Sequence, residues 1–264
     1  MRKPSFVRCL ALLALALAVT TGSALAADPE PKQILAPTGK LRAGLYPGTP
    51  TSILPGAEPR GIGYELGKEL AKRLGVPYEP VVFSKNAEVL DAVKNAKVDA
   101  VFTNASAARA KEMDFGPAYL EIELGYLVPK ASPIAALADV DVAGRRIGVT
   151  QGSTSDATLS RDLKNAAVVR AVTIGTAIEM LSDGRMDAFA TNKATLFEMA
   201  EKLPGSKILD GRWGVERHAI AIPKGREAGL PFVRKFTDDV KADGLVAAAI
   251  ARAGLRGAMT AEQK

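Results

Sequence analysis

The stretch AVKNAKVDAVFTN (residues 92–104) has a counterpart in MLSDGRMDAFATN (residues 180–192). Each begins like the end of a helix, turns at an aspartate, continues as an apolar strand and ends in Thr-Asn. Asp99 and Asp187 therefore fall at matching places. The match predicts two half-molecules built from similar helix-strand units that face one another. A common helix-to-strand connection, used twice without further relation, explains the pattern equally well from the residues alone.

Short apolar runs alternate with helical segments along the rest of the chain. In GYELGKELAKRLG (residues 63–75), Leu66, Leu70 and Leu74 fall on one stripe, and residues 86–99 show a similar periodicity. Such alternation predicts an α/β fold with largely parallel sheets flanked by helices. The predicted strands are residues 41–46, 81–83, 98–104, 125–129, 146–152, 168–172, 186–192 and 218–225.

The first residues have the pattern of a secretory signal peptide. A basic start precedes an apolar run from Cys9 to Val19, and Ala24-Leu25-Ala26 is typical of a cleavage site. We predict a signal peptide over residues 1–26, cleaved after Ala26, and a flexible Pro-rich leader over residues 27–38. The apolar run is too short for a membrane-spanning helix. The expected location is the bacterial periplasm.

Composition excludes several classes of function. Residues 1–26 carry three basic side chains and no acid, so their removal lowers the formal net charge from +6 to +3. This mild charge does not indicate nucleic-acid binding. Cys9 is the only cysteine and leaves with the signal peptide, so we expect no disulfide. His218 is the only histidine, which excludes metal sites built from several histidines. We expect no metal and no cofactor.

Three predicted strand ends carry polar side chains next to helix starts. Ligands of open parallel sheets bind at the carboxyl ends of strands, and free N–H groups and hydroxyls at helix starts suit an oxygen-rich anion. An ordinary helix cap is the simpler interpretation of each end taken alone. Because all three occur in one chain, we take them as candidate ligand-binding positions. They are Thr103, Asn104 and Arg109, then Gln151, Ser153 and Thr154, and finally Asn192.

From Gly39 to about Gly257, the order and spacing of several segments resemble the family 3 extracellular solute-binding proteins of bacterial ABC importers. The segments are GKLRAGL, GIGYELGKELAKRLG, VDAVFTNASAARAKEMDFGPAY, LADVDVAGRRIGVTQGSTSD, AIEMLSDGRMDAFATN and AIAIPKG. Most members of that family capture polar amino acids. The resemblance therefore implies a binding protein rather than an enzyme. Its implied partners are a small-molecule ligand and the permease and ATPase of an inner-membrane transporter, and we expect a monomer.

The resemblance also implies a two-lobed type II periplasmic binding protein, each lobe a mainly parallel sheet flanked by helices. We expect lobe 1 at residues 39–120 plus 219–257, lobe 2 at residues 121–218, and a C-terminal tail at residues 258–264. The chain would cross twice between the lobes, at YLEIE and RHAIA. Closure on a ligand by hinge motion at these crossings is the implied mechanism.

Family residues carry over to several positions of this chain. Arg109 stands where the family's arginine holds the ligand's α-carboxylate, and a guanidinium fork matches a carboxylate. Asn192 stands where an aspartate usually pairs with the ammonium group. Asn86 stands near the place of a sandwiching aromatic, and Tyr46 replaces an acid near the first strand. Gly116 replaces a usual serine. These departures predict a small carboxylate-bearing solute that need not be a standard amino acid.

Two other functions stay open from the sequence. A few periplasmic dehydratases acting on prephenate-like acids share this architecture, and such an enzyme needs a general acid, for which Asp156 and Glu65 are the candidates. A binding protein that serves a separate receptor is the second alternative. We expect His218 and Trp213 to have structural roles near the lobe edges.

Overall fold

The computed structural model describes residues 30–47, 51–54 and 59–262; the predicted signal peptide, its cleavage site and residues 263–264 lie outside this part of the chain. The strands are β1 (Leu41–Leu45), β2 (Tyr78–Val82), β3 (Ala100–Asn104), β4 (Met113–Val128), β5 (Arg146–Thr150), β6 (Ala167–Ala171), β7 (Ala188–Asn192), β8 (Lys207–Ile208), β9 (Gly214–Pro223) and β10 (Ala258–Thr260). The α-helices are α1 (Pro31–Leu35), α2 (Ile62–Leu74), α3 (Asn86–Lys94), α4 (Thr154–Asp162), α5 (Ile174–Ser182), α6 (Lys193–Lys202), α7 (Leu230–Ala242) and α8 (Leu245–Ala253).

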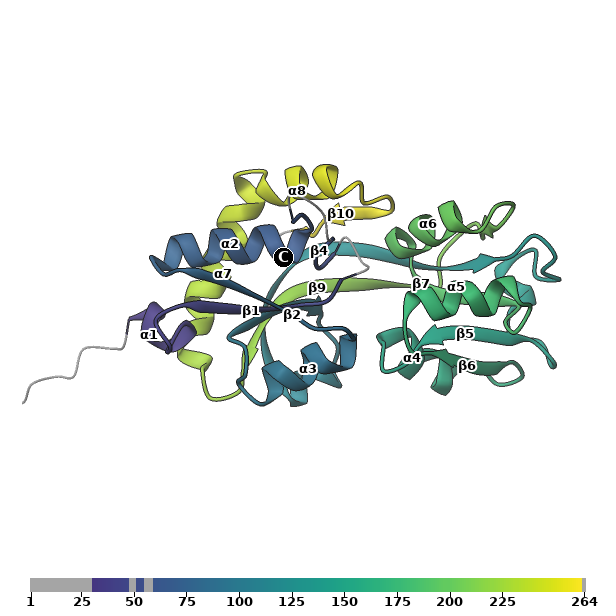
Figure 1. Cartoon of the computed structure of the whole chain (residues 1–264), viewed down its shortest axis with the longest axis horizontal. Coiled ribbons are helices and arrows are strands. Elements are labelled where there is room, and N and C mark those ends of the chain that lie inside the picture. The colour runs from purple at the N-terminus through teal and green to yellow at the C-terminus, as the bar shows by residue number, and fades with distance from the viewer. Residues whose placement is uncertain (1–29, 48–50, 55–58, 263–264) are drawn as a thin grey trace, which may run out of the picture.

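Figure 1 shows two lobes joined by the long strands β4 and β9. The hydrogen-bonded strand order is β2-β1-β3-β9-β4-β7-β5-β6. In the first lobe, β1 pairs in parallel with β2 and β3, and β3 pairs with β9 in antiparallel direction. In the second, β5 pairs in parallel with β6 and β7, and β7 pairs with β4 in antiparallel direction. The predicted α/β fold is confirmed, but the two predicted sheets are one continuous ten-stranded mixed sheet, to which each lobe contributes a mainly parallel part.

The two stretches with matching sequences have matching structures. Asp99 precedes β3 and accepts hydrogen bonds from the backbone N–H of Arg42 at 2.9 Å and from its guanidinium at 2.9 and 2.7 Å. Asp187 precedes β7 and accepts the same three bonds from Arg146, at 2.7, 3.2 and 2.7 Å. Each aspartate fastens the start of one strand to its parallel neighbour. The repeat therefore belongs to the architecture and is more than a shared connection.

Strands β4 and β9 cross between the lobes together. Their antiparallel register runs from the Met113–Pro223 pair to the Leu124–Gly214 pair. Leu120 lies opposite His218, so the two expected lobe boundaries meet at one position of this ladder. The register shifts around Pro117, which has no N–H for the ladder. Gly116 beside it has no room for a side chain, because a Cβ there would lie 2.6 Å from Val233 of α7.

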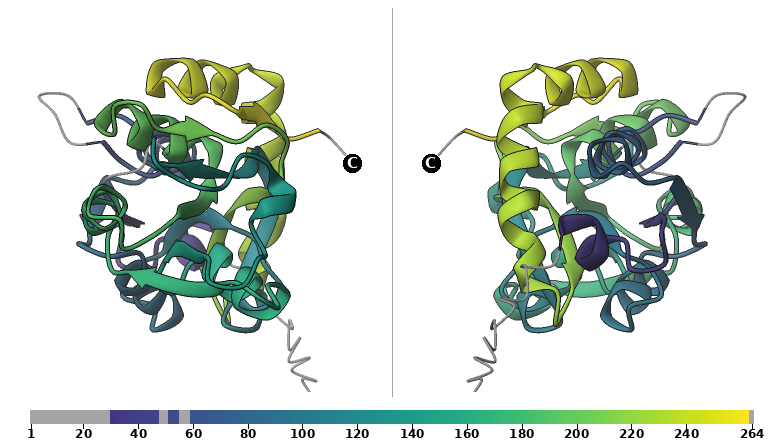
Figure 2. Two further views of the ribbon diagram at one scale, coloured as in Figure 1. Left: turned by 90° about the vertical axis from the view of Figure 1, so that its right-hand side faces the viewer. Right: turned by 90° about the vertical axis from the view of Figure 1, so that its left-hand side faces the viewer.

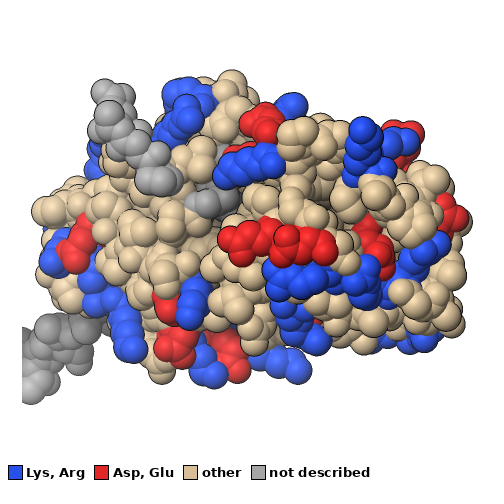
Figure 3. All heavy atoms as spheres, turned by 45° about the vertical axis from the view of Figure 1, so that its right-hand side comes forward, with Lys and Arg blue, Asp and Glu red and all other residues tan. Residues whose placement is uncertain are grey.

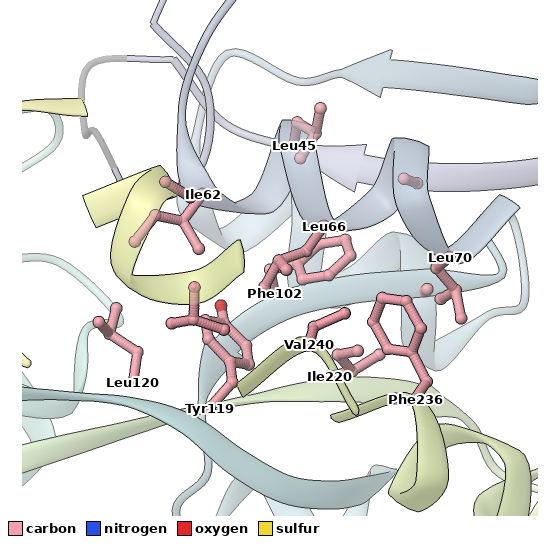
Figure 4. Close-up of a cluster of buried hydrophobic side chains, with 14 of the residues drawn as sticks. Leu45, Ile62, Leu66, Leu70, Phe102, Tyr119, Leu120, Ile220, Phe236 and Val240 are labelled. Atoms are coloured by element: carbon pink, nitrogen blue, oxygen red, sulfur yellow. The ribbon is translucent and has the colours of Figure 1, made fainter. Parts of the chain in front are cut away.

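The core of the first lobe lies between α2, the sheet and the C-terminal helices (Figure 4). The stripe of Leu66, Leu70 and Leu74 on α2 is buried, as its spacing predicts. The helix ends at Gly75, whose φ of 70° is left-handed and suits glycine. Phe102 and Tyr119 meet edge-to-face with ring centroids 6.3 Å apart, which ties β3 to β4. In the second lobe, apolar side chains from β5 and β7 fill the space on both faces of the sheet.

Both ends of the described chain are more ordered than the sequence predicts. Residues 31–35, inside the predicted flexible leader, form α1, and Leu35 is buried against the loop before α7. The predicted tail contains β10, which pairs with β4 from Leu120 to Ile122. The end views in Figure 2 show the C-terminal helices on one flank of the molecule. A single apolar anchor and a three-residue strand give too little periodicity to be predicted.

The C-terminal segment also touches the second lobe. The guanidinium of Arg256, which follows α8, lies 4.4 Å from the ring centroid of Phe197 on α6 and pairs with Glu201 at 2.6 Å. Lys193, also on α6, pairs with Glu123 of β4 at 2.6 Å. These contacts link α6 to the crossing strands and to the segment behind them. Lys193 is therefore held in an ion pair.

The surface agrees with the mild net charge. On the face drawn in Figure 3, lysine and arginine side chains are mixed with aspartate and glutamate. Such a mixture does not form the one-signed stripe typical of nucleic-acid-binding proteins. Within the described ranges, the helices are too short or too polar to span a bilayer.

The two matching aspartates differ in burial, which gives a prediction for stability. Burial alone would raise the pKa of Asp99, but hydrogen bonds from Arg42 and Arg226 hold it below its ordinary value. The side chain of Asp99 is 0% exposed and that of Asp187 is 15% exposed. At pH 7, above the unfolded pKa of about 3.9, this stabilisation is fully present, and it is lost as the pH falls through the folded-state pKa. Asp99→Asn should lower the free energy of unfolding by about 3 kcal/mol.

The matched control is Asp187→Asn, whose arginine partner is 43% exposed. We expect it to lower the free energy of unfolding by about 1 kcal/mol, because a half-exposed pair contributes less. Urea unfolding of both variants at pH 7 measures the difference. Equal urea midpoints of the two variants would show that burial does not increase the contribution of the Asp99 ion pairs to the free energy of unfolding.

Candidate functional site

A cavity of about 100 Å³ lies between the lobes, at the carboxyl ends of β3, β5 and β7. Its lining comes from both lobes and from the crossing strand β9. The space suits several water molecules or one small solute. Eight of the residues that line it were predicted from the sequence: Tyr46, Asn86, Thr103, Asn104, Arg109, Ser153, Thr154 and Asn192.

Arg109 begins the short 3-10 turn that follows β3, and it is half-buried. Its Nη1 donates to the Thr103 hydroxyl at 2.7 Å and to the Asn104 carbonyl at 3.2 Å. Among the described residues, its Nε and Nη2 have no hydrogen-bond acceptor. Burial lowers the pKa of Arg109, and the charge of Glu216 opposes this shift. An arginine remains protonated in proteins, so the cavity holds a cation with free N–H groups.

The N-terminus of α4 forms the opposite wall, in the second lobe. Ser153 caps this helix by accepting a hydrogen bond from the Asp156 N–H at 3.1 Å. The Thr154 hydroxyl accepts a hydrogen bond from the Asn104 amide at 2.9 Å, so a direct contact joins the two lobes. Ser153 is thus an ordinary cap that also faces the cavity.

Gln151 does not contribute to the cavity. Its side chain is exposed, and its backbone N–H donates to the Ala171 carbonyl at 2.8 Å. Strand β5 ends at Thr150, which lines the cavity in its place. The prediction of a ligand-facing residue at the end of this strand missed by one position. Side chains alternate along a strand, so Thr150 faces the cavity and Gln151 faces outward.

Two first-lobe residues complete the predicted set. Tyr46 follows β1 and lines the cavity; burial raises the pKa of its hydroxyl, so it is a neutral donor or acceptor. Its backbone N–H donates to the Ser52 hydroxyl at 2.8 Å. Asn86 is the first residue of α3 and also faces the cavity. Both positions offer neutral hydrogen-bonding groups.

Asn192 ends β7 and begins α6. Its side-chain oxygen caps the helix by accepting from the Thr195 N–H at 3.0 Å. Its amide nitrogen donates to a carboxylate oxygen of Glu216 at 3.3 Å. The residue therefore faces the cavity, as predicted, but it holds an acid that the sequence reasoning did not include.

Glu216 on β9 is the functional candidate that the sequence analysis missed. It is 7% exposed, lines the cavity, and hydrogen-bonds His218 through Nε2 at 3.1 Å. Burial would raise the pKa of Glu216, but the hydrogen bond and charge of His218, the charge of Arg109 and the hydrogen bond from Asn192 hold it below its ordinary value. Reading residues 214–223 with a period of two would have placed Glu216 and His218 on the same inward face as the buried Ile220.

His218 and Trp213 differ from each other in role. His218, expected to be structural, lines the cavity beside Glu216. Trp213 packs as predicted: its indole N–H donates to the Gly125 carbonyl at 3.0 Å and its ring lies 6.1 Å from that of Tyr126. Neither position forms part of a metal site, since the described chain contains no group of three or more potential metal-binding side chains.

The candidate acids for an enzyme both lie elsewhere. Asp156 is held by Arg170 at 2.9 Å and by the Gly152 N–H at 3.0 Å. Glu65 pairs with Arg252. Neither carboxylate lines the cavity. The charged groups that do line it are Arg109 and Glu216, with His218 beside them.

Comparison with known proteins agrees with this architecture. The sequence model for bacterial extracellular solute-binding proteins, family 3, matches residues 41–253. The ABC transporter glutamine-binding protein GlnH of Bacillus subtilis (strain 168) is 25% identical over 191 residues, which cover 71% of this chain and 70% of that protein. The L-cystine-binding protein TcyJ of Escherichia coli (strain K12) is 23% identical over 215 residues, 80% of each chain.

Solved structures agree as well. The crystal structure of a solute receptor for L-cysteine of Neisseria gonorrhoeae superimposes with a TM-score of 0.75 and 27% identity, covering 85% of this chain and 93% of that one. The matched segment of the family includes the crossing strands, the cavity and most of both lobes. This chain therefore belongs to the bacterial extracellular solute-binding proteins, family 3.

Proposed function

We propose that the protein is the periplasmic solute-binding component of an ABC importer and captures a small polar solute that bears a carboxylate, an amino acid or a related organic acid. The observation that carries the proposal is the half-buried Arg109, two of whose nitrogens have no acceptor in the described part of the chain, beside an inter-lobe cavity of about 100 Å³. The names of the relatives refer to glutamine, cystine and cysteine, which supports a solute of this kind.

The carboxylate of the solute would bind the guanidinium of Arg109. A planar fork with parallel N–H groups matches the two oxygens of a carboxylate, and charge-assisted bonds of this type are stronger than neutral ones. Thr103 holds one arm of the fork at 2.7 Å, so the other arm is already oriented. Hydroxyls of Ser153 and Thr154 in the second lobe would add donors to the same solute.

Binding would favour the closed arrangement of the lobes. Contacts from both lobes to one solute stabilise the closed form over the open form, and a permease can distinguish the two. The paired strands β4 and β9 are the only direct covalent crossings within residues 59–262, so hinge motion would take place there. The proposed partners are the permease and ATPase of the transporter, and the proposed working form is a secreted monomer.

The cavity does not favour an enzyme of the dehydratase type. Such chemistry needs a carboxylic acid that gives up a proton to the substrate. Among the described residues that line the cavity, Glu216 carries the one carboxylate; its pKa is lowered, so it carries no proton near neutral pH. We propose that the protein binds its solute without converting it.

Replacement of Arg109 tests the proposal. Arg109→Ala should weaken binding of the solute by at least about 30-fold, because it removes the charged partner of a buried carboxylate. A thermal-shift screen with L-glutamine, L-cysteine, L-cystine, L-arginine and simple mono- and dicarboxylates identifies a ligand, and calorimetry then gives its affinity.

Arg217→Ala is the control. Arg217 is 51% exposed and pairs with Glu121 on the outer side of the crossing strands. We expect it to bind the solute as the unchanged protein does. Full affinity in a folded Arg109→Ala variant would exclude Arg109 as the carboxylate anchor.

A further inference from the structure

Glu216 is a buried carboxylate without a strong cationic partner. In the described part of the chain, His218 is its one ion-pairing neighbour within 4.0 Å, and its hydrogen bonds from His218 and Asn192 both end on the same oxygen, Oε2. A buried carboxylate is costly to desolvate unless a charge or several donors compensate for it. The second oxygen, Oε1, accepts no hydrogen bond from any described residue. The carboxylate is thus only half satisfied by the protein.

His218 does not complete the neutralisation. Its Nε2 faces Glu216, whereas its Nδ1 is buried and has no hydrogen-bond partner among the described residues. His218 therefore gives the carboxylate one hydrogen bond, at Oε2, and none at Oε1. The contact leaves the cavity side of Glu216 without a donor from this neighbour.

Arg109 does not form an ion pair with the Glu216 carboxylate. The two charges act on each other, since each shifts the pKa of the other group. Yet the groups form no ion pair within 4.0 Å; the ion pairs of the described chain leave Arg109 without a carboxylate. Both side chains line the same cavity. A positive and a negative group that share a cavity without touching leave space for a solute that carries both charges.

We propose that Glu216 binds a cationic amino group of the solute, so that the site selects zwitterions over carboxylates that lack an amine. This inference rests on the proposed function, because it takes Arg109 as the anchor of the carboxylate. The unpaired Oε1 of Glu216 accepts from the ammonium group, and Asn192 and His218 position the carboxylate through Oε2. The buried Thr195 hydroxyl, which also lines the cavity and has no partner among the described residues, offers another acceptor nearby.

The position of Glu216 has a structural reason. It lies on β9 opposite Ile122 of β4, in the ladder that joins the lobes. The acid is therefore held by the pairing of β9 with β4 rather than by a loop. An amino group of the solute that binds Glu216 would lie at the base of the cavity. The carboxylate of the same solute would reach Arg109, which follows β3.

Calorimetry with matched probes tests the inference. The pairs are L-alanine with propanoate, L-cysteine with mercaptopropanoate and L-glutamine with glutaramate, each differing by the amino group. We expect the unchanged protein to bind at least one amino acid and to bind its amine-free partner at least about 30-fold more weakly. This comparison needs no variant, so it decides the question even if a variant fails to fold.

The Glu216→Gln variant tests the role of the negative charge directly. It keeps the shape of the side chain and one acceptor oxygen but removes the charge. We expect it to lose at least about 30-fold in affinity for the amino acid and to bind the amine-free acid no more weakly than before. Glu121→Gln is the matched control: Glu121 lies on β4, pairs with Arg217 and is not part of the cavity lining. It should leave both affinities unchanged.

The outcomes separate the two proposals. If amine-free acids bind as tightly as amino acids, or if Glu216→Gln binds the amino acid normally, this inference is wrong and the carboxylate anchor stands. If no probe binds, or if Arg109→Ala binds as tightly as the unchanged protein, the proposed function fails and this inference fails with it.

Asn192→Asp gives an independent check through stability. The aspartate would still cap α6, but it would place a second carboxylate where an N–H now lies 3.3 Å from Oε2 of Glu216. If Glu216 is charged, the melting temperature should fall by about 5 °C or more at pH 7. Repulsion raises the pKa of one carboxylate, so the deficit should shrink as the pH falls and that group takes up a proton.

Asn104→Asp is the matched control at the equivalent place of the first lobe. Its neighbours are the Thr154 hydroxyl and Arg109, with which a carboxylate interacts favourably. We expect no comparable pH-dependent deficit. An Asn192→Asp protein with an unchanged melting temperature would show that Glu216 does not hold a negative charge beside residue 192.

Discussion

The antiparallel pairing of β4 with β9 is the constraint on which the rest of the structure depends. It joins the lobes, completes the sheet of each one and carries Glu216 and His218 to the base of the cavity. Because these side chains alternate with outward-facing ones, a shift of one residue in the register would remove both from the cavity. The bulge at Pro117 and the close approach of Gly116 to α7 fix that register from the first-lobe side.

Asn104 and Asn192 occupy equivalent positions in the two lobes but make different contacts. Asn104 and Asn192 each close a strand that begins beside an Asp-Arg pair. Asn104 spans the gap to Thr154 in the other lobe, whereas Asn192 caps its own helix and supports Glu216. The repeated unit gives both lobes the same backbone arrangement. Because the contacts of Asn104 and Asn192 differ, the cavity is asymmetric: the cation, Arg109, belongs to the first lobe and the anion, Glu216, lies on the crossing strand β9.

Much of the fold could be predicted from the sequence. Eight of the ten strands and the amphipathic stripe of α2 have local periodicity, and the Asp-to-Asn repeat indicated related halves. Strand β4, however, was predicted only over residues 125–129, whereas it begins at Met113. Arg109, Thr103 and Asn192 could be placed because parallel strand ends converge. Glu216 could not be found in the same way. It lies within a strand and not at its end, and only the pairing of β9 with two other strands shows which face turns toward the cavity. The order of α1 and β10 depends on tertiary contacts that a short segment does not encode.

The contact of Arg256 with α6 has a mechanical consequence. It joins the last helix of one lobe to the other lobe, behind the strands about which the lobes would turn. An arginine side chain has several rotatable bonds and can slide its guanidinium over the face of an aromatic ring while staying within reach of a carboxylate. In the hinge motion that we propose, this connection would act as a flexible tether rather than a lock. It would follow a small rotation of the lobes and would resist a large separation.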